Sequence, residues 1–170
     1  MKTIKLLLIL FLYTAISSCS KEGPAGPAGA QGNANVTPNT YTVASWDNNG
    51  YVYYANFSVS ALTSSIQNGG AIETFLSTDG GTDWSALPFT QFISGGSNYM
   101  WTYTTSVGNV EVIWTYNGIG LGSDPNTIYG VSSCEFKVVC IAPAAMKKYP
   151  NANWKDYKQV KVILGSSCSL

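Results

Sequence analysis

Short runs in which apolar and polar residues alternate, separated by Gly and Asn, are the pattern that most limits what this 170-residue chain can fold into. They begin at Tyr41, and in the run 110–116 the apolar side chains occupy every second position. A period of two places such side chains on one face of a strand, and closely spaced turns join antiparallel neighbours. We therefore predict an all-β fold, an antiparallel β-sandwich of about seven to eight strands with a short C-terminal helix.

The predicted strands share this alternation or are rich in β-branched and aromatic residues, and they span 41–46, 51–60, 71–77, 89–93, 99–105, 110–116 and 136–141. The turn Asp47–Gly50 is predicted to join the first two strands into a hairpin. Pro143 is predicted to end the last strand. The side chains predicted to face the core from the second and last strands are Tyr51, Tyr53, Ala55, Phe57, Val59, Phe136, Val138 and Cys140.

Helix is predicted at two places. The segment Thr63–Asn68 reads as a single turn closed by Gly69 and Gly70. In the segment Asn153–Gly165, apolar residues recur at helical spacing, with Asn153 as the N-cap, whereas 160–164 alone could form a strand. We predict a short helix there, packed over one end of the sandwich.

The chain contains no His and no Arg. Histidine is the usual general base near neutral pH, and arginine is the usual bidentate ligand for carboxylate and phosphate. Their absence excludes His-based catalytic triads, His-ligated metals and Arg-based phosphate sites. No Lys lies between Lys21 and Lys137, so the body of the domain is acidic, and we expect no nucleic-acid partner.

The N-terminus resembles a bacterial lipoprotein signal. Lys2 and Lys5 precede the apolar stretch 6–12, and Ser17 and Ser18 lead into Cys19. The apolar stretch is too short to span a bilayer. The resemblance implies that residues 1–18 are a removed signal peptide and that Cys19 carries covalent lipid, including palmitate. Apart from this lipid we expect no cofactor.

Residues 19–36 are predicted to be a tether between the lipidated cysteine and a domain at 37–170. The tether contains collagen-like triplets, with glycine at every third position: Gly23, Gly26, Gly29 and Gly32. So few triplets gain little from trimer contacts against the entropy of aligning three chains. We therefore expect a monomer.

The chain is similar to the collagen-like-repeat lipoproteins of gram-negative bacterial envelopes. The resemblance rests on Cys19 and the glycine triplets, and within the domain on the Gly69-Gly70 turn, the Leu87-Pro88 step, the strand Phe136–Ile141 and the segment 153–164. It implies an all-β domain with no assigned catalytic residues.

Three cysteines remain once Cys19 is assigned to lipid. Cys134 and Cys140 lie too far apart along one extended strand to bond to each other, at roughly 20 Å. We predict a Cys134–Cys168 disulfide, because Cys140 lies in the more apolar part of the strand. Three buried free thiols are the alternative.

Aromatic residues offer one candidate ligand site. Trp46, Trp84, Trp101 and Tyr103 could include an exposed platform that stacks on sugar rings, although aromatics at alternate strand positions usually belong to the core. Trp84 is the best candidate, because it lies beside a loop.

Carboxylates offer two weaker candidates. Asp79 and Asp83 flank a Gly-Gly turn and could bind calcium, although Asp at such spacing commonly caps a turn. Glu73 and Glu111 could be the paired carboxylates of a glycosidase, but nothing in the sequence places them together. We expect no metal site and no enzymatic activity.

The sequence thus predicts an outer-membrane lipoprotein, periplasmic or surface-exposed, with a non-catalytic binding or structural domain. The alternative function is a carbohydrate-binding module on the cell surface. The membrane, reached through the lipid, is the predicted partner, together with a glycan or another envelope protein.

Overall fold

The computed structural model describes residues 36–93, 95, 97–117 and 122–165. The chain divides into two compact units, 1–31 and 32–170, and all described residues belong to the second. The predicted signal peptide, Cys19, nearly all of the tether and Cys168 lie outside the described residues. Strand β1 begins at Val36, the last residue assigned to the tether.

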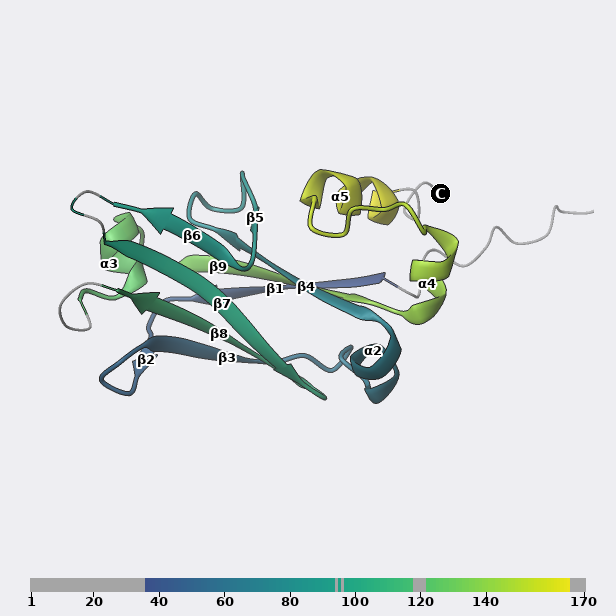
Figure 1. Cartoon of the computed structure of the whole chain (residues 1–170), viewed down its shortest axis with the longest axis horizontal. Coiled ribbons are helices and arrows are strands. Elements are labelled where there is room, and N and C mark those ends of the chain that lie inside the picture. Colours follow the sequence, from purple (N-terminus) through teal and green to yellow (C-terminus); the bar gives the residue numbers. More distant parts are fainter. Residues whose placement is uncertain (1–35, 94, 96, 118–121, 166–170) are drawn as a thin grey trace, which may run out of the picture. The chain divides into compact units, whose positions relative to one another are not determined.

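Two antiparallel sheets form the described part of the chain, which confirms the predicted all-β sandwich with a C-terminal helix (Figure 1). The four-stranded sheet has the order β1-β9-β4-β5, built from Val36–Val43, Cys134–Ile141, Ala71–Ser77 and Ser85–Ala86. The five-stranded sheet has the order β2-β3-β8-β7-β6, built from Asp47–Asn48, Tyr53–Ser58, Asn109–Tyr116, Asn98–Ser106 and Phe89–Phe92.

The main core lies between the two sheets. Alternate residues of β8 and β9 point into it, as the period of two predicted. These inward side chains are all buried: Val110, Val112, Trp114, Phe136, Val138 and Cys140. In β3 the prediction holds for Phe57, which is buried, and for Tyr53 and Ala55, which pack against the core. It is wrong for Tyr51, which is 84% exposed in the turn before the strand.

The predicted hairpin between the first two long strands is wrong. β1 pairs along its whole length with β9, from Val36 opposite Ile141 to Val43 opposite Cys134. The first two residues of the predicted turn, Asp47 and Asn48, form the short β2, and residues 49–52 connect it to β3. Alternation along a strand shows which side faces the core but not which strand lies beside it, so adjacency in sequence was the wrong guide here.

The chain crosses from one sheet to the other around Trp46. Its indole Nε1 donates to Asn126 Oδ1 at 3.1 Å, and its ring packs 5.8 Å from that of Phe136. Asn126 also donates to the carbonyls of Val43 and Ala44, at 3.0 and 3.1 Å. This buried amide therefore fixes the crossover, because it satisfies the carbonyls that β1 leaves unpaired at its end.

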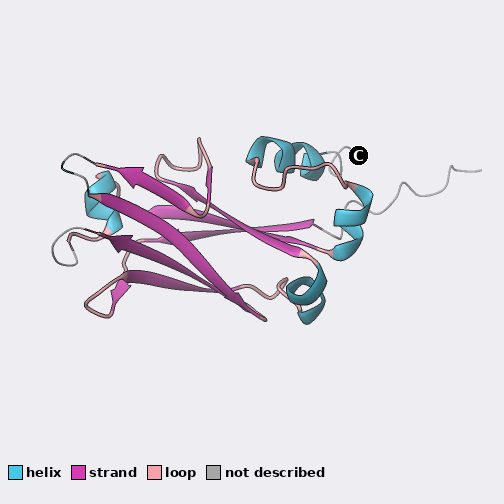
Figure 2. Cartoon of the chain, viewed as in Figure 1, coloured by secondary structure: helices cyan, strands magenta, loops and turns pink. Residues whose placement is uncertain are grey.

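Short helices occupy the ends of the sandwich (Figure 2). α2 (Ser64–Gly69) is the predicted helical turn, with Thr63 as its N-cap. A Cβ atom at Gly70 would collide with the carbonyl oxygen of Ile141, so this close approach requires glycine. α3 (Pro125–Tyr129) was not predicted.

Two further helices cover the outer face of the four-stranded sheet (Figure 1). α4 (Pro143–Lys148) starts at the proline expected only to end a strand, and Pro is favoured in the first turn of a helix. α5 (Tyr157–Gly165) is the predicted C-terminal helix, but it starts later than expected. Asn153 does not cap it, because its Oδ1 accepts from the N–H of Lys155 in a preceding turn.

A second core lies beneath these helices. Val160 of α5 and Ala145 of α4 are buried against Phe75, Val139 and Ile141 of the sheet. α5 therefore covers a face of the sandwich. We had predicted that it would pack over one end, and that prediction is wrong. Among the described residues, no helix has both the length and the apolarity that crossing a membrane requires.

Replacing Phe75 by Ala should lower the free energy of unfolding by about 3–5 kcal/mol, because the ring is 0% exposed and its removal leaves a cavity under α5. Phe92→Ala is the matched control, since that ring is 78% exposed, and it should change stability by no more than about 0.5 kcal/mol. Urea denaturation followed by tryptophan fluorescence measures both. Equal effects of the two substitutions would show that the helical layer does not form a second core.

Candidate functional site

A pocket of about 670 Å³ lies beside the helical layer, and we call it the Trp84 pocket. Three segments line it: the loop that leads into β5, one outward-facing position of β9, and the start of α5. The lining residues are Gly81, Thr82, Asp83, Trp84, Lys137, Lys155, Asp156, Tyr157, Lys158 and Lys161. The pocket therefore combines two aromatic rings, four lysines and two aspartates.

Trp84 forms one wall of this pocket but is not an open platform. The residue is half-buried, and its indole Nε1 donates to the carbonyl oxygen of Gly81 at 2.9 Å. Its ring packs against that of Tyr157, with 5.6 Å between centroids and 48° between planes. The ammonium of Lys137 lies 4.0 Å from the Trp84 ring centroid. A sugar ring could not stack flat on the face that this ammonium covers.

Lys137 is held in place from two sides. β9 turns it toward the helical layer, opposite Phe75 of β4. Its Nζ donates to the hydroxyl of Tyr157 at 2.6 Å and lies 4.6 Å from that ring's centroid. An ammonium over two aromatic rings gains from their negative faces. No carboxylate among the described residues forms an ion pair with it.

The rim of the pocket carries excess positive charge. Lys155, Lys158 and Lys161 are exposed, and together with Lys137 they outnumber Asp83 and Asp156. The Asp156 carboxylate accepts from the N–H of Lys158 at 2.9 Å and from Gln159 Nε2 at 3.3 Å, one donor at each oxygen. The Glu135 carboxylate lies beside Gly81 at the other wall, so the positive charge is concentrated on the lysine side of the pocket, and that side suits an anionic group.

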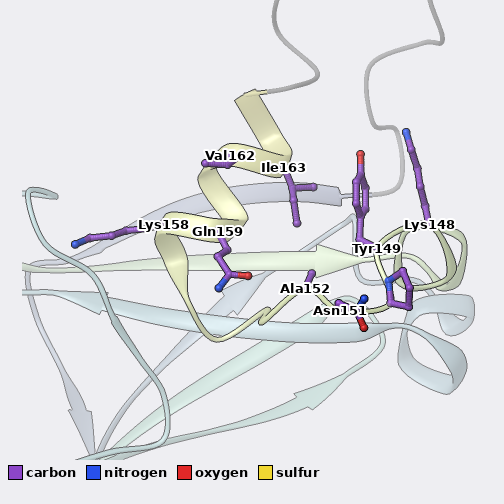
Figure 3. A pocket seen from close by; sticks show the side chains of 9 residues that line it. Lys148, Tyr149, Asn151, Ala152, Lys158, Gln159, Val162 and Ile163 are labelled. Carbon is purple, nitrogen blue, oxygen red and sulfur yellow. The ribbon is translucent and has the colours of Figure 1, made fainter.

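A second, more apolar groove of about 550 Å³ lies on the other side of α5 (Figure 3). The groove lies between α5 and the loop after α4. Its lining includes Tyr149 and Ala152 from the loop and Val162 and Ile163 from α5. Figure 3 shows the Lys158 side chain extending away from Tyr149. This lysine nevertheless lines the apolar groove as well as the Trp84 pocket, so it lies between the two.

The other predicted platform aromatics belong to the core. Trp101 is fully buried, and its Nε1 donates to the hydroxyl of Tyr129 at 3.1 Å. Trp46 packs between the sheets, as described above. Tyr103 donates its hydroxyl to the carbonyl oxygen of Ile72 at 2.7 Å, which links the two sheets. Trp84 therefore stays the best candidate for ligand contact, while Trp46 is half-buried and lines a separate pocket of about 480 Å³.

The Asp79 carboxylate organises its own loop. It accepts from the hydroxyl of Ser77 at 2.6 Å and from the N–H groups of Thr82 and Asp83, each at 3.1 Å. These hydrogen bonds hold the pKa of Asp79 below its usual value. They favour the turn interpretation over the calcium interpretation. The described residues contain no group of three or more His, Cys, Asp or Glu placed to hold a metal ion.

Glu73 and Glu111 do not meet. Glu73 lies on β4 of the four-stranded sheet, and Glu111 lies on β8 of the five-stranded sheet. By alternation, each side chain lies on the outer face of its own sheet. Burial raises the pKa of Glu73, and the positive charge of Lys155 partly offsets this rise. The structure thus gives no support to a paired-carboxylate glycosidase.

Cys134 and Cys140 are buried free thiols. Burial raises the pKa of Cys134 from 9.0 to about 12, and that of Cys140 to about 11, so neither is a reactive thiolate at neutral pH. Cys168 lies outside the described residues, and the free state of Cys134 gives no support to the predicted Cys134–Cys168 disulfide.

Comparison with protein-family models, with curated proteins and with solved structures found no match for this chain.

Lys137 and Tyr157 are the site residues that we did not predict from the sequence. The concentration of lysines after residue 136 was visible, but nothing connected it to Trp84, which lies some fifty positions earlier. The antiparallel pairing of β4 with β9 makes that connection, because it brings Lys137 to the face covered by α5.

Lys137→Met should lower the free energy of unfolding by about 1–2 kcal/mol, because it keeps the aliphatic stem but removes both the hydrogen bond and the contact of the charge with two rings. Lys147→Met, at an exposed position on α4, is the control and should shift stability by no more than about 0.5 kcal/mol. A double-mutant cycle with Tyr157→Phe should give a coupling energy of about 1 kcal/mol. Additive effects would mean that the contact contributes nothing.

Stability should fall as the pH rises above about 9. Both the folded and the unfolded protein keep their thiols protonated below the unfolded-state pKa of 9.0. Between that value and the folded-state values of about 11 and 12, only the unfolded thiols ionise, which favours unfolding. Tyr103, whose pKa burial raises to about 12, acts in the same direction at higher pH.

Urea midpoints at about pH 8 and pH 10 measure this decline. A double variant, Cys134→Ala with Cys140→Ala, should lose less stability over that interval, whatever its stability at pH 8. An equal loss in both proteins would contradict the role of the buried thiols.

Proposed function

We propose that this protein is a lipoprotein of the gram-negative outer membrane, anchored through Cys19, whose β-sandwich is a non-catalytic binding domain. The Trp84 pocket is its binding surface. The observation that carries the binding role is Lys137, a half-buried ammonium held by two aromatic rings at a pocket and without a carboxylate partner among the described residues.

The anchor is supported by the N-terminal sequence. Two lysines, a short apolar stretch and two small residues before Cys19 match the order of a lipoprotein signal. The glycine triplets that follow Cys19 agree with the resemblance to collagen-like-repeat envelope lipoproteins. A tether of this kind leaves the domain free to meet a partner near the membrane.

The binding role is supported by the chemistry of the pocket. Its volume of about 670 Å³ is in the range of small-molecule sites. Buried or half-buried charges are normally paired, so an ammonium without an anionic partner suits a ligand that supplies the anion.

A carbohydrate-binding module is the second candidate. The specific observation in its favour is that Trp84 and Tyr157 line the same pocket as Asp83 and Asp156, whose carboxylates can accept hydrogen bonds from sugar hydroxyls. Flat stacking on an open tryptophan is not the mode available here, because Lys137 covers the ring.

Cys19→Ser should abolish lipidation and keep the chain as an uncleaved precursor in the producing bacterium, because the thiol is the group that is acylated. Globomycin, which inhibits lipoprotein signal peptidase, should also cause the precursor to accumulate. Mass spectrometry of the purified N-terminus, together with partition into detergent, measures both effects. Cys168→Ser is the control and should leave lipidation intact. An unmodified N-terminus in the unaltered protein would rule out the anchor.

A further inference from the structure

We infer that the Trp84 pocket binds an acidic saccharide, a sugar chain that carries carboxylate groups. This inference rests on the proposal that the Trp84 pocket is the binding surface, and it goes further by naming the chemical class of the ligand.

The lysines of the pocket are the reason for inferring a negatively charged ligand. Lys137 is held at the pocket wall by its hydrogen bond to Tyr157 and its contact with the Trp84 ring, and it forms no ion pair among the described residues. Lys158 and Lys161 add two exposed ammonium groups at the rim. Lys155 contributes less, because the carboxylate of Glu73 partly neutralises it. A ligand carboxylate near Lys137 would complete the pairing that the protein leaves open.

The two aspartates of the pocket are the reason for inferring that the ligand also carries hydroxyl groups. Asp83 and Asp156 line the same pocket and would repel a ligand that presents only negative charge, such as inorganic phosphate. A saccharide avoids this conflict, because its hydroxyls can donate to the carboxylates while its acid group meets the lysines. The parts of Trp84 and Tyr157 that line the pocket offer apolar surface for the C–H groups of the sugar.

The position of the lysines also argues against a flat anionic membrane as the partner of this site. Such a surface would be attracted by every exposed lysine of the helical layer, including Lys147 and Lys148 of α4. Those two do not line the Trp84 pocket. They therefore provide a matched control that separates binding in the pocket from attraction to the basic helical layer as a whole.

The experiment uses the mature chain carrying Cys19→Ser, which keeps the protein free of lipid. It is applied to an array of uronate- and sialate-containing oligosaccharides, with neutral oligosaccharides of matched length alongside. The acidic glycan that binds best is then titrated by calorimetry at two salt concentrations. We expect binding confined to the acidic members, and a lower affinity at higher salt.

The variants locate the site. A Lys158→Gln, Lys161→Gln double variant should bind about tenfold more weakly, because it removes two of the cations at the rim. A Lys147→Gln, Lys148→Gln double variant should bind as the unaltered protein does. All four positions are exposed, so circular dichroism should show unchanged folding. Trp84→Ala is less useful, because that ring also packs against the second core.

The possible failures are distinguishable. Equal binding of neutral and acidic glycans, weakened by the pocket variant alone, would overturn the acidic class but leave the pocket as a binding site. Equal weakening by the two double variants, together with binding to phosphatidylglycerol vesicles, would overturn the pocket and favour a membrane-facing basic surface. If the protein binds no acidic glycan on the array, the inference is overturned. The result of the lipidation experiment would still stand by itself.

Discussion

The burial of β9 on both faces is the constraint on which the rest of the structure depends. Phe136 and Val138 point into the core between the sheets, while Val139 and Ile141 point into the core beneath α4 and α5. The strand also pairs with β1 on one side and with β4 on the other. It therefore joins both cores and the centre of one sheet, which explains why its last four residues, Val138–Ile141, are all apolar and fully buried.

Lys137 places a charged side chain in this strand, which is buried on both faces. This lysine lies two residues after Glu135 and on the same face as Val139, where an ordinary buried strand would place another aliphatic residue. Its charge is tolerated there because Tyr157 accepts its hydrogen bond and two rings surround it. The same contacts attach the start of α5 to the sheet. Structural support and ligand recognition would therefore depend on one side chain, so a variant at Lys137 cannot separate them, whereas variants at the rim can.

The sequence predicted what local periodicity encodes and missed what depends on long-range pairing. The alternation of Val110, Val112 and Trp114 identified β8 and its core face, and Gly70 marked the end of α2. The partner of β1 could not be predicted, because β9 follows it by some ninety residues and the register is set by both cores together. Trp84 was found as a candidate because it lies beside a loop, but Lys137 and Tyr157 reach it only through the folded sheet and helix.

The point at which the tether joins the domain bears on how an anchored protein could use the pocket. β1 begins at Val36 opposite Ile141, beside the strand end that leads into α4. Lys137 lies four residues back along β9, toward the other end of the strand. Residues 19–35 could span at most roughly 60 Å when extended. If Cys19 carries lipid as proposed, the domain stays within that distance of the bilayer.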